Sequence, residues 1–106
     1  MPALGAGSNY SVFWRLHEPD LIWRRYDDVW VIFQRSAGKT HFLNEASASI
    51  LGSLGSGALD LYAICAALVG ESTDSISGSE QEFVRMHLRH LDALGLVCRT
   101  TVAGAQ

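Results

Sequence analysis

One set of side chains in the sequence could bind a metal ion. His87 and His90 lie three residues apart in a stretch with helical periodicity, so they share one helix face. His41 falls on a short predicted strand that would lie near this helix, and imidazole nitrogens are common zinc ligands. A pair of histidines at this spacing is a weak signal, however, and no acidic residue of a known helical metal motif accompanies it. The simpler interpretation is that these histidines face solvent or line a groove, and no metal or other cofactor is expected.

The other polar motifs do not predict catalysis. The acidic pair at 27–28 could act as two carboxylates, but it falls between two apolar segments and is typical of a hairpin turn. Gly55 and Gly57 follow no strand and fit no nucleotide-binding pattern, and the serines before them lie in no nucleophile elbow. The sequence therefore predicts a protein that is not an enzyme.

Arg85 and Arg89 share a face of the same predicted helix, because they lie four residues apart. The last helix of a helix-turn-helix protein enters the DNA major groove with such residues, so a winged-helix DNA-binding module is the alternative function. The chain carries 8 Lys+Arg against 11 Asp+Glu, and its net charge of -3 disfavours a diffuse affinity for nucleic acid. The plainer interpretation is a solvated face on which Glu82 pairs with Arg85, and a nucleic-acid partner is not expected.

Length and composition predict one soluble, cytoplasmic domain. With 106 residues, 48% of them apolar, the chain can bury one core. Cys65 and Cys98 are too few for a disulfide framework and lack metal-ligand spacing, as expected in a reducing compartment. The first ten residues lack the basic residue and apolar core of a secretion signal. The longest apolar run, at 61–69, is short of the roughly 20 residues that cross a bilayer, so no membrane partner is expected.

The first half of the chain is predicted to be a meander of antiparallel strands. Three segments are rich in branched and aromatic residues, which favour strands: 21–26, 29–33 and 40–43. The acidic pair at 27–28 and the glycine-containing segment 36–39 supply the turns between them. The segment 13–17 is a candidate fourth strand.

The second half of the chain is predicted to be helical. Asn44 and Asp60 are N-cap residues for the first two helices, and Ser79 with Glu82 matches the capping box of a third. A further edge strand is possible at 96–98. Strands followed by helices predict an α+β fold, winged-helix-like, with a three-stranded antiparallel meander followed by three helices. The expected domain spans 10–99, between a mobile N-terminus, 1–9, and a mobile tail, 100–106.

The strand at 40–43 is followed at once by a helix, so it is predicted to be a sheet edge. An unpaired edge exposes backbone N–H and C=O groups and can accept another chain as an added strand. Four or five such hydrogen bonds and two or three buried apolar anchors would give about micromolar binding. Alternatively, the N-terminal segment or a second copy of the chain covers this edge.

The order of these pieces resembles the PqqD-like family. The segment 25–28 precedes the strand at 29–33, and the run Ser-Ala-Gly-Lys-Thr-His-Phe-Leu-Asn at 36–44 resembles the family's turn and short strand closing on Leu-Asn. The helices and a closing Gly-Leu-Val at 95–97 follow in family order, so the resemblance covers about residues 21–98. The aromatic N-terminus and the stretch at 38–44 are most similar to the subgroup called HPr-rel-A system PqqD family peptide chaperones.

The resemblance implies three antiparallel strands and three helices that recognise ribosomally made precursor peptides. The leader peptide would add beside the third strand, in a groove walled by the third helix. The domain, a monomer or homodimer, would deliver it to a modifying enzyme such as a radical SAM protein or an HPr-kinase-related protein. The residues expected to bind the peptide are Lys39, Thr40, His41, Phe42, Leu43, Arg85, Met86, Arg89 and His90. The choice of helical residues is our inference from position, and the extra segment 10–17 departs from the family pattern.

Overall fold

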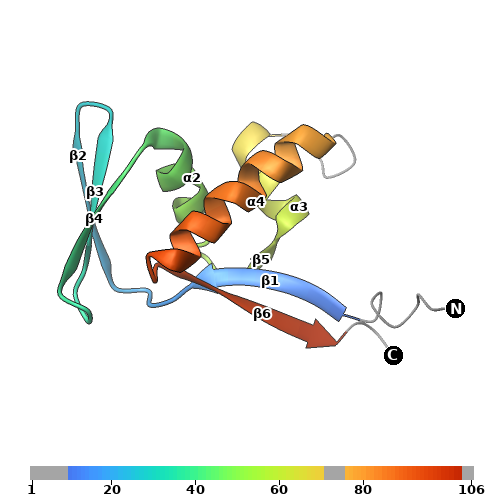
Figure 1. The fold of residues 1–106 in the computed structure, drawn as a ribbon, viewed down its shortest axis with the longest axis horizontal. Helices are drawn as coiled ribbons and strands as arrows, with labels where there is room; N and C mark the ends of the chain where they lie inside the picture. Colours follow the sequence, from blue (N-terminus) through green and yellow to red (C-terminus); the bar gives the residue numbers. More distant parts are fainter. Residues whose placement is uncertain (1–9, 71–75, 104–106) are drawn as a thin grey trace, which may run out of the picture.

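The computed structural model describes residues 10–70 and 76–103, and within them the chain forms two antiparallel sheets and three helices (Figure 1). The elements in chain order are β1 (Tyr10–Leu16), β2 (Leu21–Tyr26), β3 (Val29–Gln34), β4 (Lys39–Leu43), α2 (Glu45–Ser53), β5 (Leu59–Asp60), α3 (Leu61–Val69), α4 (Gly78–Ala93) and β6 (Val97–Ala103). The predicted α+β class, with a meander followed by helices, is confirmed. The mobile N-terminus predicted at 1–9 lies outside the described residues.

The first sheet is the predicted meander, in the order β2-β3-β4. The turn between β2 and β3 contains Asp27 at a positive φ of 56°, which an aspartate tolerates. The turn between β3 and β4 contains Gly38 at a φ of 63°, where a side chain would be strained. These two turns place β4 on the outside of the sheet, with β3 as its neighbour.

The second sheet corrects two expectations about the ends of the domain. The segment containing 13–17 does not extend the meander, because β1 pairs with β6 and β5 in a separate sheet of order β5-β1-β6. The strand expected at 96–98 begins at Val97 and continues to Ala103, so residues 100–103 are not the start of a mobile tail. The β-branched residues Thr100 and Thr101 suit a strand, and their partners in β1 lie too far away in the sequence to be anticipated.

The helices begin at capping residues. The Asn44 side chain accepts a hydrogen bond from the backbone N of Ser47, and the Asp60 side chain accepts one from Ala63, as expected for two N-caps. The cap of α4 lies two residues before the predicted one, at Ser77, whose side chain accepts from Glu80 while the Glu80 carboxylate accepts from Ser77. The same Ser-x-x-Glu spacing occurs twice in succession here.

The core lies where α2, α3 and α4 meet the inner faces of both sheets. Its buried side chains are aliphatic, with one indole and one thiol: Trp14, Ile32, Leu43, Ala48, Ile50, Leu51, Leu54, Ile64, Cys65, Val84, Leu88, Leu91, Leu96 and Val97. Figure 1 shows the meander at one end of the molecule and the β1–β6 ribbon running beneath α4 towards the other end. Within the described ranges no helix has the length and apolar character needed to span a bilayer.

The position of the α4 cap can be tested with two neighbouring serines. Ser77→Ala removes the cap hydrogen bond and should lower the free energy of unfolding by about 1 kcal/mol. Ser79→Ala is the matched control, because the Ser79 hydroxyl forms a hydrogen bond only with the Ser77 hydroxyl, at 3.2 Å, among the described residues, and it should cost less than about 0.5 kcal/mol. Urea unfolding followed by circular dichroism measures both, and an equal or larger loss for Ser79→Ala would contradict this cap.

Candidate functional site

The outer edge of β4 has no strand partner within the described residues. β4 pairs with β3 in the register Trp30↔Leu43 to Gln34↔Lys39, and no other strand joins it. The N-terminal segment, which was one candidate to cover this edge, pairs elsewhere as β1. The meander therefore ends in an open strand edge, as the sequence predicted for 40–43.

The register identifies which backbone groups face the open edge. Residues that flank a two-residue hairpin turn, here Tyr26 and Val29, exchange hydrogen bonds with each other. Because the hydrogen-bonding direction alternates along a strand, the backbone N–H and C=O groups of every second residue of β3, from Trp30 onwards, point to β4. On β4 the partners of those residues bond to β3, which leaves the N–H and C=O groups of Thr40 and Phe42 facing outwards. The edge thus offers two residues, and up to four hydrogen bonds, to an added strand.

The side chains of β4 alternate between the core and the solvent. His41 and Leu43 are buried on the inner face, whereas Phe42 is 70% exposed and Thr40 also faces solvent. Of the predicted edge residues, Thr40 and Phe42 could therefore pair with a peptide, whereas Lys39, His41 and Leu43 use their backbone groups to bond to β3. The sequence predicted the edge but did not distinguish the residues that face outwards from those that bond to β3.

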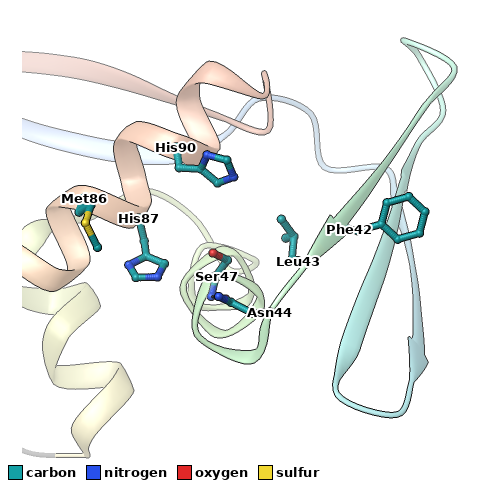
Figure 2. A pocket seen from close by; sticks show the side chains of 7 residues that line it. All are labelled: Phe42, Leu43, Asn44, Ser47, Met86, His87 and His90. Carbon is teal, nitrogen blue, oxygen red and sulfur yellow. The ribbon is translucent and has the colours of Figure 1, made fainter.

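A cavity of about 350 Å³ lies between the end of β4, the start of α2 and the middle of α4. Figure 2 shows His87 and His90 of α4 on the side towards Asn44 and Ser47 at the start of α2, Met86 further along α4, and Leu43 pointing from β4 towards this space. Phe42 also lines the cavity, although its ring lies on the side of β4 away from α4. The structure thus brings Phe42 and Leu43 together with Met86 and His90, as predicted, and we call this cavity the β4–α4 groove.

The groove also contains three residues that the sequence did not assign to it, which are Asn44, Ser47 and His87. The cap hydrogen bond from Ser47 N to Asn44 Oδ1, at 2.8 Å, fixes Asn44 at the mouth of the groove. The Nδ1 of His87 donates to the backbone oxygen of Phe83 at 2.8 Å, because a carbonyl oxygen only accepts. The Nε2 of a neutral His87 is therefore a hydrogen-bond acceptor. The i,i+3 spacing of His87 and His90 was the available signal, and their position agrees with the simpler interpretation that these histidines face solvent or line a groove.

A buried hydrogen-bonded chain supports β4 from behind. Gln34 Nε2 donates to the backbone oxygen of Gly95 at 3.0 Å, and His41 Nε2 donates to Gln34 Oε1 at 3.0 Å. Both side chains are less than 9% exposed, and removal from water lowers the pKa of His41 below its ordinary value, with a smaller contribution from the charge of Lys39. The neutral form of the His41 side chain therefore stabilises β4. This side chain does not reach the groove.

The three histidines do not form a metal site. His41 is buried beside Gln34, whereas His87 and His90 line the groove on α4. No group of three or more His, Cys, Asp or Glu residues with metal-binding potential occurs in residues 10–70 and 76–103.

Arg85 and Arg89 do not line the β4–α4 groove. They border a different cavity, on the flank of α4 that faces β1 and β6. At about 100° per residue, Arg85 and His87 point about 200° apart around the helix axis, so one groove cannot contain both. The α4 side of the groove therefore includes Met86 and His90, as predicted. It also includes His87, and it excludes both arginines. The expected ion pair between Glu82 and Arg85 is present at 3.0 Å.

Comparisons of the chain with protein-family models, with curated proteins and with solved structures found no match.

The lowered pKa of His41 predicts a pH-dependent stability. The folded protein binds fewer protons than the unfolded chain as the pH falls below the ordinary His value of 6.5, so the free energy of unfolding should decrease there until the folded pKa is passed. His41→Gln keeps a donor for Gln34 but does not titrate, and it should flatten this dependence. The hydrogen bond from the Ser36 side chain lowers the pKa of Glu18, so this group affects the stability separately, at pH values below its ordinary value of 4.5.

Urea unfolding of both proteins at several pH values between 4.5 and 6.5 measures this effect. Equal slopes for the wild type and His41→Gln would contradict the role of His41.

Proposed function

We propose that the chain is a non-catalytic peptide-binding chaperone that takes the leader of a ribosomally made precursor peptide as an added strand beside β4. The observation that carries the proposal is the open β4 edge directly bordered by the β4–α4 groove. An open edge can bind backbone groups of any sequence, and an adjacent cavity can select side chains. The two features together are what strand addition with sequence preference requires.

Simple magnitudes indicate that both features are needed. Four backbone hydrogen bonds at about 1 kcal/mol net each correspond to about millimolar binding, before the cost of association. Each apolar peptide side chain buried against Met86, which is 55% exposed, would add about 1.5–3 kcal/mol. One or two such anchors in a cavity of about 350 Å³ would bring the affinity towards micromolar.

The resemblance to PqqD-like proteins supports the same function and suggests partners. It leads us to propose that the bound leader is presented to a modifying enzyme, such as a radical SAM protein or an HPr-kinase-related protein. The proposed site consists of Thr40, Phe42 and Leu43 on β4 and Met86, His87 and His90 on α4. Arg85 and Arg89 are no longer part of it, because they border another cavity.

Thr40 provides a sharp test of strand addition. Thr40→Pro removes an N–H that faces the open edge, and an edge strand tolerates proline where the N–H makes no ladder bond. Thr40→Val is nearly isosteric and keeps the N–H. We expect Thr40→Pro to weaken leader binding at least about tenfold, because one hydrogen bond is lost and the ring obstructs the added strand, whereas Thr40→Val should change it less than about twofold.

The three tagged proteins would be used in parallel to capture partners from the native lysate, with mass spectrometry of peptides and proteins. A captured ribosomal peptide would then be synthesised and titrated by calorimetry. Equal affinity for Thr40→Pro would contradict strand addition. Capture of DNA without any peptide, with a sequence-selective and steeply salt-dependent gel shift, would favour the winged-helix DNA-binding alternative.

Met86 tests the groove separately from the edge. Met86→Ser removes an adaptable apolar contact and should weaken binding of the same peptide about tenfold or more. Tyr62→Ser is the matched control, because Tyr62 on α3 is also exposed, at 47%, and lies outside the groove. Urea unfolding midpoints measured for both variants would show whether either substitution destabilises the fold. Equal effects of the two substitutions would show that the groove contributes no selectivity.

A further inference from the structure

Three of the eight basic side chains of this acidic chain border one cavity. The cavity, of about 360 Å³, lies on the flank of α4 opposite the β4–α4 groove and is lined by Val12, Trp14, Leu61, Arg85, Arg89 and Arg99. The arginines come from two elements that are brought together only by the fold, because α4 supplies two and β6 supplies the third. We call this cavity the arginine pocket.

The cations of the arginine pocket are only partly neutralised. Arg85 pairs with Glu82 at 3.0 Å, whereas Arg89 and Arg99 have no ion-pair partner in residues 10–70 and 76–103. Arg85 and Arg89 are like charges at i,i+4, a spacing that destabilises a helix. A cavity of about 360 Å³ is about 9 Å across, close to the Debye length at physiological salt, so salt weakens but does not abolish the repulsion between the charges around it. An anion in the pocket would relieve this repulsion.

The floor of the arginine pocket is apolar. Trp14 is 7% exposed and Val12 is 42% exposed, and Leu61 completes this surface. The Arg99 guanidinium lies 6.0 Å from the centre of the Trp14 ring, a cation–π contact that holds it over the floor. A ligand that fits would therefore offer an anionic group to the arginines and a hydrocarbon group to the floor.

We propose that the arginine pocket binds a carboxylate-bearing peptide segment of a partner protein, in which Glu or Asp side chains flank an apolar residue. Arg guanidinium groups bind carboxylates in a bidentate manner, and the apolar floor accepts the neighbouring side chain. A nucleic-acid backbone fits less well, because it follows an extended row of cations, and only three line this pocket. The site is separate from the peptide site of the proposed function, so α4 can be contacted on both flanks at once.

The probe is a short, end-capped peptide of alternating Glu and Leu, titrated into the isotopically labelled full-length chain while NMR signals of the arginine Nε–Hε groups are recorded. A peptide with Gln in place of Glu is its neutral control. We expect the Glu peptide to shift the signals of Arg89 and Arg99 saturably, and the Gln peptide to leave them unchanged. Added salt should weaken the binding, since part of the attraction is screened.

Matched charge variants separate the pocket from general electrostatics. Arg89→Gln with Arg99→Gln should weaken binding of the Glu peptide at least about tenfold. The melting temperature should change little, because the relieved repulsion offsets the loss of the Arg99–Trp14 cation–π contact. Arg24→Gln with Arg35→Gln removes the same charge on the meander, where Arg35 makes only a long, exposed ion pair of 3.9 Å, and should change the affinity less than about twofold. Thr40→Pro should leave this binding intact, so failure of strand addition and failure of the arginine pocket give different results.

Unchanged binding by the Arg89→Gln/Arg99→Gln protein, or an equal loss in the meander variant, would overturn the proposal. Inorganic phosphate or a single-stranded oligonucleotide that shifts the same arginine signals at lower concentrations than the Glu peptide would also overturn it, in favour of a phosphate site.

Discussion

The side-chain amide of Gln34 connects the two parts of the molecule that form the β4–α4 groove. Its nitrogen donates to the Gly95 backbone oxygen just after α4, and its oxygen accepts from His41 on β4. A buried amide or imidazole without a partner costs about 1–3 kcal/mol, so this chain of bonds is satisfied in only one relative position of strand and helix. The groove walls therefore depend on a polar link beneath the sheet, one that involves no side chain of the groove itself.

A second link holds the meander against α2. The Trp30 indole nitrogen donates to Glu45 at 3.1 Å, and Arg25 reaches the same carboxylate at 3.3 Å while its guanidinium lies 5.4 Å from the Trp30 ring centre. Trp23 meets Trp30 edge to face, with ring centres 5.8 Å apart. These contacts are partly exposed, so each contributes little alone. Together with the Gln34 bond to Gly95, they hold the meander against both α2 and the end of α4.

Local signals in the sequence predicted the elements, but long-range pairing determined the site. The strands of the meander, the caps at Asn44 and Asp60 and the sheet edge follow from residues close together in the chain, and each was predicted. The pairing of β1 with β6 joins segments more than 80 residues apart, with Tyr10 opposite Ala103, and no local pattern encodes it. That pairing removes β1 from the meander and, with α4, creates the arginine pocket. The position of Arg85 and Arg89 was missed because a helix pattern shows which residues share a face, but not which neighbour that face meets.

An open edge strand is a hazard, since it can pair with another copy of the chain, and the geometry of β4 limits this hazard. Only Thr40 and Phe42 face outwards, so pairing two such edges would gain few hydrogen bonds, which correspond to about millimolar affinity at best. Lys39 at the start of the strand adds like-charge repulsion between copies. Under the proposed function, a leader peptide differs from a second copy because its side chains can also enter the β4–α4 groove. Selectivity for the peptide would then come from the groove formed by Met86, His87 and His90, and the short edge would supply register without encouraging self-association.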